Sequence, residues 1–147
     1  MNKEELRTKL IEIQNNIVKE LEAKIATTHS MVDIDEESTH DPEDYSHQYE
    51  SGELESLVRT QLNKAKVSLS ILEDIDFSLT DIVKDGAFVQ TEKFNFVIGF
   101  PTVPFDINGM HIVGVSKASP IYPFMFGKRE GDSFEFSGKK YVIKRVN

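Results

Sequence analysis

The side chains best suited to chemistry in this sequence are carboxylates, and they gather in one stretch. Residues 25–58 contain ten acidic residues and neither Lys nor Arg. Carboxylate oxygens are the ligands that hard cations such as Mg²⁺ prefer. Because most charge runs simply lie in solvent, the stretch predicts either a solvated acidic loop or an acidic surface offered to a cation, a metal site or a basic cleft. The ten acids are Asp33, Asp35, Glu36, Glu37, Asp41, Glu43, Asp44, Glu50, Glu53 and Glu55.

Three histidines, His29, His40 and His47, lie near these acids. His47 and Glu50 are three residues apart, so both could ligate one metal ion if their segment is helical. No complete ligand motif accompanies them, and exposed polar side chains are the alternative interpretation. A fourth histidine, His111, lies in an apolar segment, where we interpret it as structural and not catalytic. We therefore expect no metal ion bound by this chain on its own.

Composition limits what the chain can be. Its 147 residues suit one or two small domains, and the absence of Cys excludes disulfides, thiol nucleophiles, zinc knuckles and iron–sulfur clusters. The 15 acids outside residues 25–58 nearly balance all 17 basic residues, so we expect no direct binding of duplex DNA. The first residues lack an apolar signal core, and no run approaches the ~18 apolar residues of a membrane span. We expect a cytoplasmic protein without membrane contact.

The elements that must position the acids are two long helices. One apolar stripe at helical spacing precedes the acidic stretch and a second follows it. Pro42 disfavours a helical conformation at Asp41, so we expect the chain to turn there and the helices to pack antiparallel. This predicts a coiled-coil hairpin over residues 1–78 with an acidic tip near residues 33–53. The stripes are Leu6, Leu10, Ile13, Ile17, Leu21, Ile25 and Val32, and then Leu54, Val58, Leu62, Ala65, Leu69, Leu72 and Ile75.

After residue 78 the composition becomes that of a small β domain. Nine of the ten Phe and seven of the eight Gly lie beyond Asp85, and Ser137-Gly138 reads as a turn. Apolar and β-branched runs indicate short strands. We expect them at residues 88–89, 94–98, 111–115, 133–136 and 141–143.

One short helix is expected at residues 120–126. Ser119 would be its N-cap, Pro120 its first residue and Gly127 its C-terminal stop. Phe124 would point into a core that the many Phe residues build. The predicted fold class is therefore α+β. An N-terminal antiparallel helical hairpin is followed, at residues 79–147, by a small antiparallel β domain that contains a short helix.

The segment around this helix carries a recognisable pattern. Ser116 and Ser119-Pro120 are followed by a short apolar helix and then by Gly127-Lys128 and Gly131-Asp132. This order resembles the C-terminal signature of the bacterial Gre transcript-cleavage factors, and the match covers about residues 113–146. An antiparallel coiled coil with an acidic tip, placed before such a domain, is also that family's layout. The resemblance implies a fold like that of the FK506-binding proteins (FKBP-like) for the C-terminal domain.

The same resemblance implies an accessory factor of RNA polymerase and not an enzyme. The C-terminal domain would dock at the rim of the secondary channel, and the hairpin would enter the channel toward the active-site Mg²⁺. Acids at the tip would help hold a second metal ion while the polymerase hydrolyses backtracked RNA. We expect a monomer that contacts nascent RNA only indirectly and has no cofactor of its own. The residues implicated are Asp41, Glu43 and Asp44 at the tip, and Ser119, Pro120, Phe124, Gly127 and Lys128 in the docking signature.

The tip departs from the family's pattern. Cleavage-competent tips read Asp-x-x-Glu-Asn, whereas this chain has Asp41, Asp44 and Tyr45 at the corresponding places. Asp is one methylene shorter than Glu, and a misplacement of about 1 Å can cost ~10²-fold in rate. The tip could therefore promote RNA cleavage or inhibit synthesis. Asp35 and Glu50 are further candidates for the acids that matter.

Two other interpretations come from different classes of protein. An FKBP-like domain could be a peptidyl-prolyl isomerase, although this rests on fold analogy. The long helices could instead form a plain coiled-coil interaction module that dimerises. An isomerase assay distinguishes the first alternative, and a mass measured by light scattering distinguishes the second.

Overall fold

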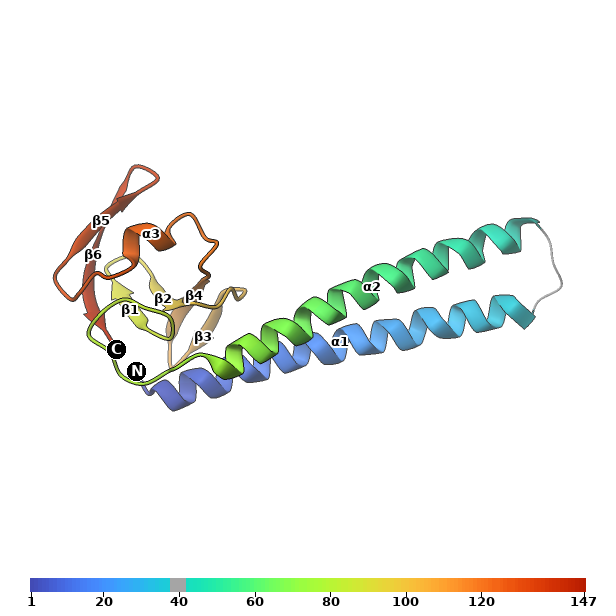
Figure 1. Ribbon diagram of the computed structural model, residues 1–147, viewed down its shortest axis with the longest axis horizontal. Helices are drawn as coiled ribbons and strands as arrows, with labels where there is room; N and C mark the ends of the chain where they lie inside the picture. The colour runs from blue at the N-terminus through green and yellow to red at the C-terminus, as the bar shows by residue number, and fades with distance from the viewer. Residues whose placement is uncertain (38–41) are drawn as a thin grey trace. The chain divides into compact units, whose positions relative to one another are not determined.

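The computed structural model describes the backbone of residues 1–37 and 42–147 and the side chains of residues 1–28 and 52–147. The chain divides into two compact units (Figure 1). Residues Ile11–Glu73 form one unit, which is a helical hairpin. Residues Met1–Leu10 and Asp74–Asn147 form the other, which holds a six-stranded sheet. The fold is thus α+β with an N-terminal helical hairpin, as the sequence predicts.

The hairpin consists of α1, Lys3–Glu37, and α2, Pro42–Asp74, which run antiparallel beside each other (Figure 1). Both helices are longer than the sequence predicts, because α1 continues past residue 32 and α2 already begins at Pro42. Most of the expected tip at residues 33–53 is therefore helical. Pro42 suits the first position of a helix, where the missing N–H costs nothing. Gly52 lies inside α2 and does not end it.

The two helices meet along one apolar seam. Val18 and Ile25 of α1 pack with Val58, Leu62 and Ala65 of α2. This confirms the second predicted stripe over residues 58–65. In the first predicted stripe, Ile25 is buried in the seam, and Ile17 and Leu21 pack against it while staying partly exposed.

Near the middle of α1, Gln14 and Val18 are buried, whereas Ile13 and Ile17 are only partly buried. Steps of four residues, close to the helical period, bring residues 14 and 18 to the same side. A Gln is tolerated at the seam because its Nε2 donates a hydrogen bond to the carbonyl oxygen of Ala65, 2.9 Å away. An amide with such a partner avoids the cost of an unsatisfied buried polar group.

The prediction of an antiparallel domain is wrong, because the sheet contains both antiparallel and parallel strand pairs. Its strand order is β3-β4-β2-β1-β6-β5, and β2 pairs with β4 in parallel. The cause is a second hairpin, β3–β4, which places β4 beside β2 after two reversals of the chain. The strands are β1 Phe88–Thr91, β2 Asn95–Ile98, β3 Phe105–Ile107, β4 Met110–Val115, β5 Ser133–Phe136 and β6 Lys139–Val146.

Two tight turns hold the hairpins of this sheet. Ser137 and Gly138 both have positive φ, at 54° and 76°, and join β5 to β6 as the sequence predicts. Asn108 and Gly109 have φ of 52° and 76° and join β3 to β4. Two consecutive positive φ values match the twist of paired strands, which explains why Gly follows Asn or Ser here.

One hydrophobic cluster of this unit contains several aromatic rings of the sheet. Stacked rings of Phe134 and Tyr141, with centroids 5.1 Å apart, lie beside Phe96. Short helix α3, Tyr122–Met125, contributes Met125, which is fully buried. Outside this cluster, Phe88, Val97 and Ile112 are fully buried as well. The cluster consists of Val83, Ala87, Val89, Phe96, Ile98, Val115, Met125, Phe134, Tyr141, Ile143 and Val146.

The first turn of α1 belongs to the same unit as the sheet. Lys3 is only 7% exposed, and its Nζ donates hydrogen bonds to the carbonyl oxygens of Gly86 and, at 2.8 Å, of Asn147. Its ammonium also lies 6.0 Å from the ring centroid of Phe77. Burial lowers the pKa of Lys3 from 10.5 to about 8, against the raising effect of Asp76. A charged side chain thus ties the start of the chain to the sheet.

Within the described residues, no helix combines the length and the apolar character that a membrane span requires.

Candidate functional site

The predicted tip acids lie where the two helices of the hairpin are joined. Asp41 lies outside the described residues. Glu43 and Asp44 are in the first turn of α2, and Asp35 and Glu50 are in α1 and α2, but the side chains of all four lie outside the described residues. Acidic residues in a first helical turn are stabilised by the positive end of the helix dipole. Their chemical role stays a prediction.

His47 and Glu50 both lie in α2, so the helical backbone that their predicted pairing requires is present. Their side chains also lie outside the described residues. Among the residues whose side chains are described, no three His, Asp or Glu side chains come together as a metal site would need. The histidine pair therefore remains a prediction.

The Ser-x-x-Ser part of the predicted docking signature forms a tight turn. The backbone N–H of Ser116 donates to Oγ of Ser119 at 3.0 Å, and the two hydroxyl oxygens are 3.2 Å apart. The backbone N–H of Ser119 donates in turn to the carbonyl oxygen of Ser116 at 3.0 Å. The turn requires the two serines to be three residues apart, because the backbone N–H of each serine donates to an oxygen of the other. The prediction that Ser119 caps the short helix is therefore wrong.

Helix α3 begins later than the sequence predicts. Its N-cap is Ile121, without a side-chain hydrogen bond, and the proline in its first turn is Pro123 and not Pro120. The reason is that the hydroxyl of Ser119 is already used by the preceding turn. Gly127 has φ of 80° and follows the helix, as predicted for the residue that stops it.

After α3 the chain pairs with the segment that precedes β1. The backbone N–H of Gly127 donates to the carbonyl oxygen of Val83 at 2.9 Å, and that of Val83 donates to the carbonyl oxygen of Lys128 at 2.8 Å. Lys128 is half-buried, and its backbone holds this pairing. Arg129 adds an ion pair of 2.9 Å with Asp81. The Gly-Lys part of the signature thus fixes the end of α3 to the sheet unit.

A polar cluster holds the other side of α3. The hydroxyl of Tyr122 donates to Oδ1 of Asp85 at 2.9 Å, while Lys117 forms an ion pair with Oδ2 of Asp85 at 3.0 Å. Burial, with the Asp85 carboxylate as a second cause, raises the pKa of Tyr122 to about 12. Sequence reasoning missed Asp85 and Lys117, because nothing in their local spacing links residues so far apart.

These anchors present aromatic side chains to solvent. Phe124 is 49% exposed and Phe126 is 56% exposed. Phe124 leans on Phe136, with ring centroids 5.8 Å apart, and Phe126 stacks on Tyr122 at 5.6 Å. We call Tyr122, Phe124, Phe126 and Phe136 the α3 aromatic surface. The prediction that Phe124 belongs to the core is wrong, because Met125 is the residue of this one-turn helix that is buried.

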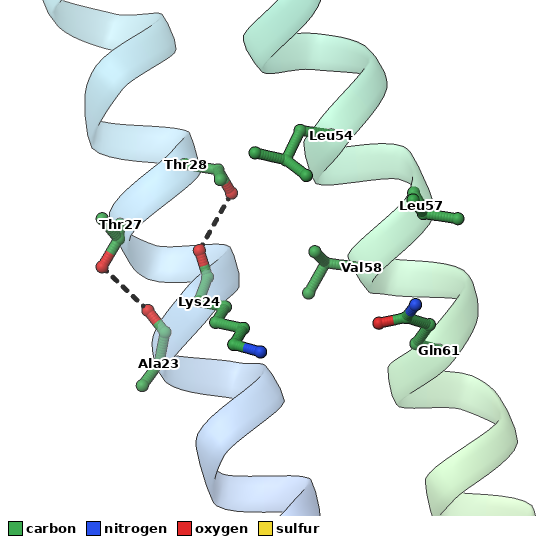
Figure 2. A pocket seen from close by; sticks show the side chains of 8 residues that line it. All are labelled: Ala23, Lys24, Thr27, Thr28, Leu54, Leu57, Val58 and Gln61. Atoms are coloured by element: carbon green, nitrogen blue, oxygen red, sulfur yellow. Dashed lines mark hydrogen bonds between the residues drawn. The ribbon is translucent and has the colours of Figure 1, made fainter.

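A second apolar surface lies between the helices of the hairpin. A groove of about 580 Å³ lies between α1 and α2, and Figure 2 shows the side chains that line it. Leu54 is 49% exposed there, which corrects its predicted place in the seam. The hydroxyls of Thr27 and Thr28 donate to carbonyl oxygens of α1 itself. The groove is lined by Ala23, Lys24, Thr27, Thr28, Leu54, Leu57, Val58 and Gln61.

Comparisons with known proteins find few matches. No family model matches the chain, and no curated protein matches it. Two solved chains match it, and one is the GreA factor homolog 1 (Gfh1) protein of Thermus thermophilus. That match has 14% sequence identity and a TM-score of 0.37, and covers 93% of this chain and 94% of that chain. The identity and the TM-score are too low for this similarity to establish a family or a function.

Proposed function

We propose that this chain is an accessory factor of RNA polymerase, which docks through the α3 aromatic surface and offers the acids of its hairpin to the polymerase's active-site Mg²⁺. The observation that carries the proposal is the α3 aromatic surface itself. Two rings about half exposed, Phe124 and Phe126, sit on a turn and a strand pairing made by the Gre-like signature. Exposed aromatic residues on a fixed support are typical of protein interfaces.

The hairpin suits entry into a channel. Two helices with a single buried seam make a narrow element, and the 35 residues of α1 correspond to a length of about 52 Å. The sequence puts acids at residues 33–44, on both sides of the change from α1 to α2. A confined cation attracts carboxylates strongly, because little water screens the interaction.

The chemistry that we infer belongs to the polymerase and not to this chain. The acids would supply oxygen ligands to a weakly held second metal ion, and the polymerase would hydrolyse the backtracked RNA by a two-metal displacement. If the shorter Asp44 holds the ion in an unproductive position, the same docking slows nucleotide addition. Nascent RNA is then affected only through the polymerase.

A stalled elongation complex tests this proposal. We expect the wild-type chain either to shorten the RNA or to slow its extension. Asp41→Asn/Asp44→Asn should abolish the effect, while Glu20→Gln/Glu22→Gln, which makes the same charge change on exposed residues of α1, should preserve it. If the wild-type chain at saturating concentration changes neither cleavage nor extension, the proposed function is wrong.

Docking is tested separately by co-elution with the polymerase. Phe124→Ala/Phe126→Ala should abolish co-elution, since both rings are exposed and their loss leaves the core intact. Phe94→Ala, another partly exposed ring on the same unit, is the matched control and should co-elute normally. Normal co-elution of the double variant would exclude the α3 aromatic surface as the docking site.

An FKBP-like isomerase would need a pocket lined by aromatic residues. The rings of Phe96 and Phe134 both pack against Tyr141 in the core, with centroids 6.4 Å and 5.1 Å from that of Tyr141. These three rings therefore contribute to the stability of the core. Turnover of a proline-containing peptide by the full chain would support the isomerase instead of the accessory factor. A dimer in light scattering would support the coiled-coil interaction module.

A further inference from the structure

The groove between α1 and α2, here called the hairpin groove, lies where the seam of the hairpin opens. Val58, Leu62 and Ala65 of α2 are only 6–8% exposed, so the seam is closed along them. Leu54 continues the same stripe one helical turn before Val58, yet it is 49% exposed. An apolar side chain at a seam position therefore lacks the cover that the next ones have.

The α2 wall of the hairpin groove is apolar. Figure 2 shows Leu54 and Val58 on the side of α2 that faces α1. Leu57 also lines the groove and is 56% exposed. Two neighbouring leucines that are about half exposed leave apolar area in water, and a partner that covers this area gains free energy.

The threonines of the α1 wall have no hydroxyl proton left for a ligand. The hydroxyl of Thr27 donates to the carbonyl oxygen of Ala23 at 3.1 Å, and that of Thr28 donates to the carbonyl oxygen of Lys24 at 3.0 Å. Each hydroxyl has one proton to donate, and α1 itself already accepts it. Apolar contact and charge are therefore the main properties by which this groove can select a partner.

The backbone of both walls is occupied as well. The groove lies within α1 and α2, whose N–H and C=O groups bond along each helix. An extended peptide needs free backbone partners such as a sheet edge provides. A helix satisfies its own backbone groups and presents only side chains. The occupant that fits this groove is therefore a helix.

The charge around the hairpin groove fixes the sign of its partner. All lining residues lie within residues 20–61, a stretch with twelve acidic and only two basic residues. One of the two, Arg59, is paired with Glu55 at 2.8 Å. The other, Lys24, lines the groove four residues after the exposed Glu20, a spacing at which opposite charges on a helix attract each other. This stretch of the hairpin attracts a cationic partner.

We propose that the hairpin groove binds a cationic amphipathic helix of a partner protein. The apolar side of that helix covers Leu54 and Leu57, and its Lys and Arg side chains face the acids of α1 and α2. A third helix packs in this way through the same ridges and grooves that join any two helices. A second copy of this chain fits less well, because it brings two strongly acidic stretches together.

Fluorescence anisotropy with the full chain and a labelled peptide of leucine and lysine tests the proposal. The leucines recur every three or four residues, so that the peptide as a helix has one apolar and one cationic side. We expect saturable binding of one peptide per chain. A peptide of the same composition, reordered so that no helical side is apolar, should bind at least about tenfold more weakly. No polymerase is present, so the result does not depend on the function proposed above.

Variants of α2 locate the binding site. Leu54→Ala/Leu57→Ala should weaken binding at least about tenfold, because the apolar area that the peptide covers is lost. Val67→Ala/Ile71→Ala is the matched control, since these side chains are 59% and 52% exposed on α2 but do not line the hairpin groove. This control should leave binding unchanged. Ala suits a helix, and far-UV circular dichroism checks that each variant keeps the fold.

The charge of the groove is tested by neutralising one exposed acid on each helix. Glu20→Gln/Glu53→Gln should weaken binding about threefold at 50 mM salt and less at 500 mM, because salt screens exposed charges. Glu130→Gln/Glu135→Gln makes the same change on exposed residues of the other unit and should have less effect.

Three results would overturn the proposal. Equal binding of the reordered peptide would mean that charge alone attracts the peptide. Unchanged binding by the folded Leu54→Ala/Leu57→Ala variant, or an equal loss in the Val67→Ala/Ile71→Ala control, would place the peptide outside the hairpin groove. A dimer in light scattering that Leu54→Ala/Leu57→Ala converts to a monomer would show that a second copy fills the groove.

Discussion

Lys3 makes the stability of this protein depend on pH in an unusual direction. Its pKa is lowered from 10.5 to about 8, chiefly because burial removes water from the ammonium group. Between these two pH values the unfolded chain keeps a proton that the folded chain has released. The free energy of unfolding therefore rises as pH rises through this window. Below pH 8 both states are protonated, and the folded protein bears the full penalty of the buried charge.

The size of the effect follows from the same two values. The gap from about 8 to 10.5, at about 1.4 kcal/mol per pH unit, corresponds to ~3 kcal/mol. This is an upper value, because any relaxation that admits water to Lys3 reduces it. Against a typical total stability of about 5–15 kcal/mol, a gain of ~1–3 kcal/mol is measurable.

Urea unfolding followed by far-UV circular dichroism measures the effect at intervals from pH 7.5 to 10.5. Other ionisable groups change charge in the same range, so the matched variant is Lys3→Met, which keeps an unbranched side chain of similar length and removes the ionisable group. The difference in unfolding free energy between wild type and Lys3→Met should shift by ~1–3 kcal/mol in favour of wild type as pH rises. Parallel curves for the two proteins would show that Lys3 has an ordinary pKa, and the reasoning from its burial would be refuted.

Three further substitutions test how residues hold the fold, each by urea unfolding. Gly52→Ala should stabilise α2 by ~0.5–1 kcal/mol, because the added Cβ meets open space and the flexible glycine is removed from a helix; a loss of stability would mean that this part of α2 is not helical. Met125→Ala should cost ~2–5 kcal/mol, because Met125 is fully buried in the core; a loss below ~1 kcal/mol would contradict that burial. Gly127→Ala should cost ~1 kcal/mol through its φ of 80° alone, since no atom lies within 4 Å of an added Cβ, and a neutral result would show that the turn relaxes.

Local sequence patterns predicted most elements of this fold, for identifiable reasons. Helical spacing of apolar residues needs no knowledge of the partner, and Val58, Leu62 and Ala65 are buried as that spacing requires. The turn at Ser137-Gly138 was equally visible, because positive φ at both residues depends on the residue types themselves. Strand β3 was missed, although Asn108-Gly109 between two apolar runs is a hairpin signal of the same kind.

The candidate site was less predictable, because residues whose types suit one role take another role in the fold. Ser119 has the right type and position for a helix cap, but its hydroxyl bonds to Ser116 instead. Phe124 is apolar, but a single helical turn has room for one inward residue, and Met125 occupies it. The exposure of Phe124 and Phe126 follows from that arrangement, which no local pattern contains.

The sequence by itself determined the helical hairpin, the run of acids around the change from α1 to α2, the tight turn before β6 and the Gre-like signature. All of these depend on the residue types within a few positions of one another. Only the tertiary structure decided that β2 and β4 are parallel, that Lys3 is buried beside Gly86, and that Lys93 donates a hydrogen bond to the backbone of Lys140. Each of these joins residues far apart in the chain, and such contacts are set by strand order and register, which local spacing does not encode.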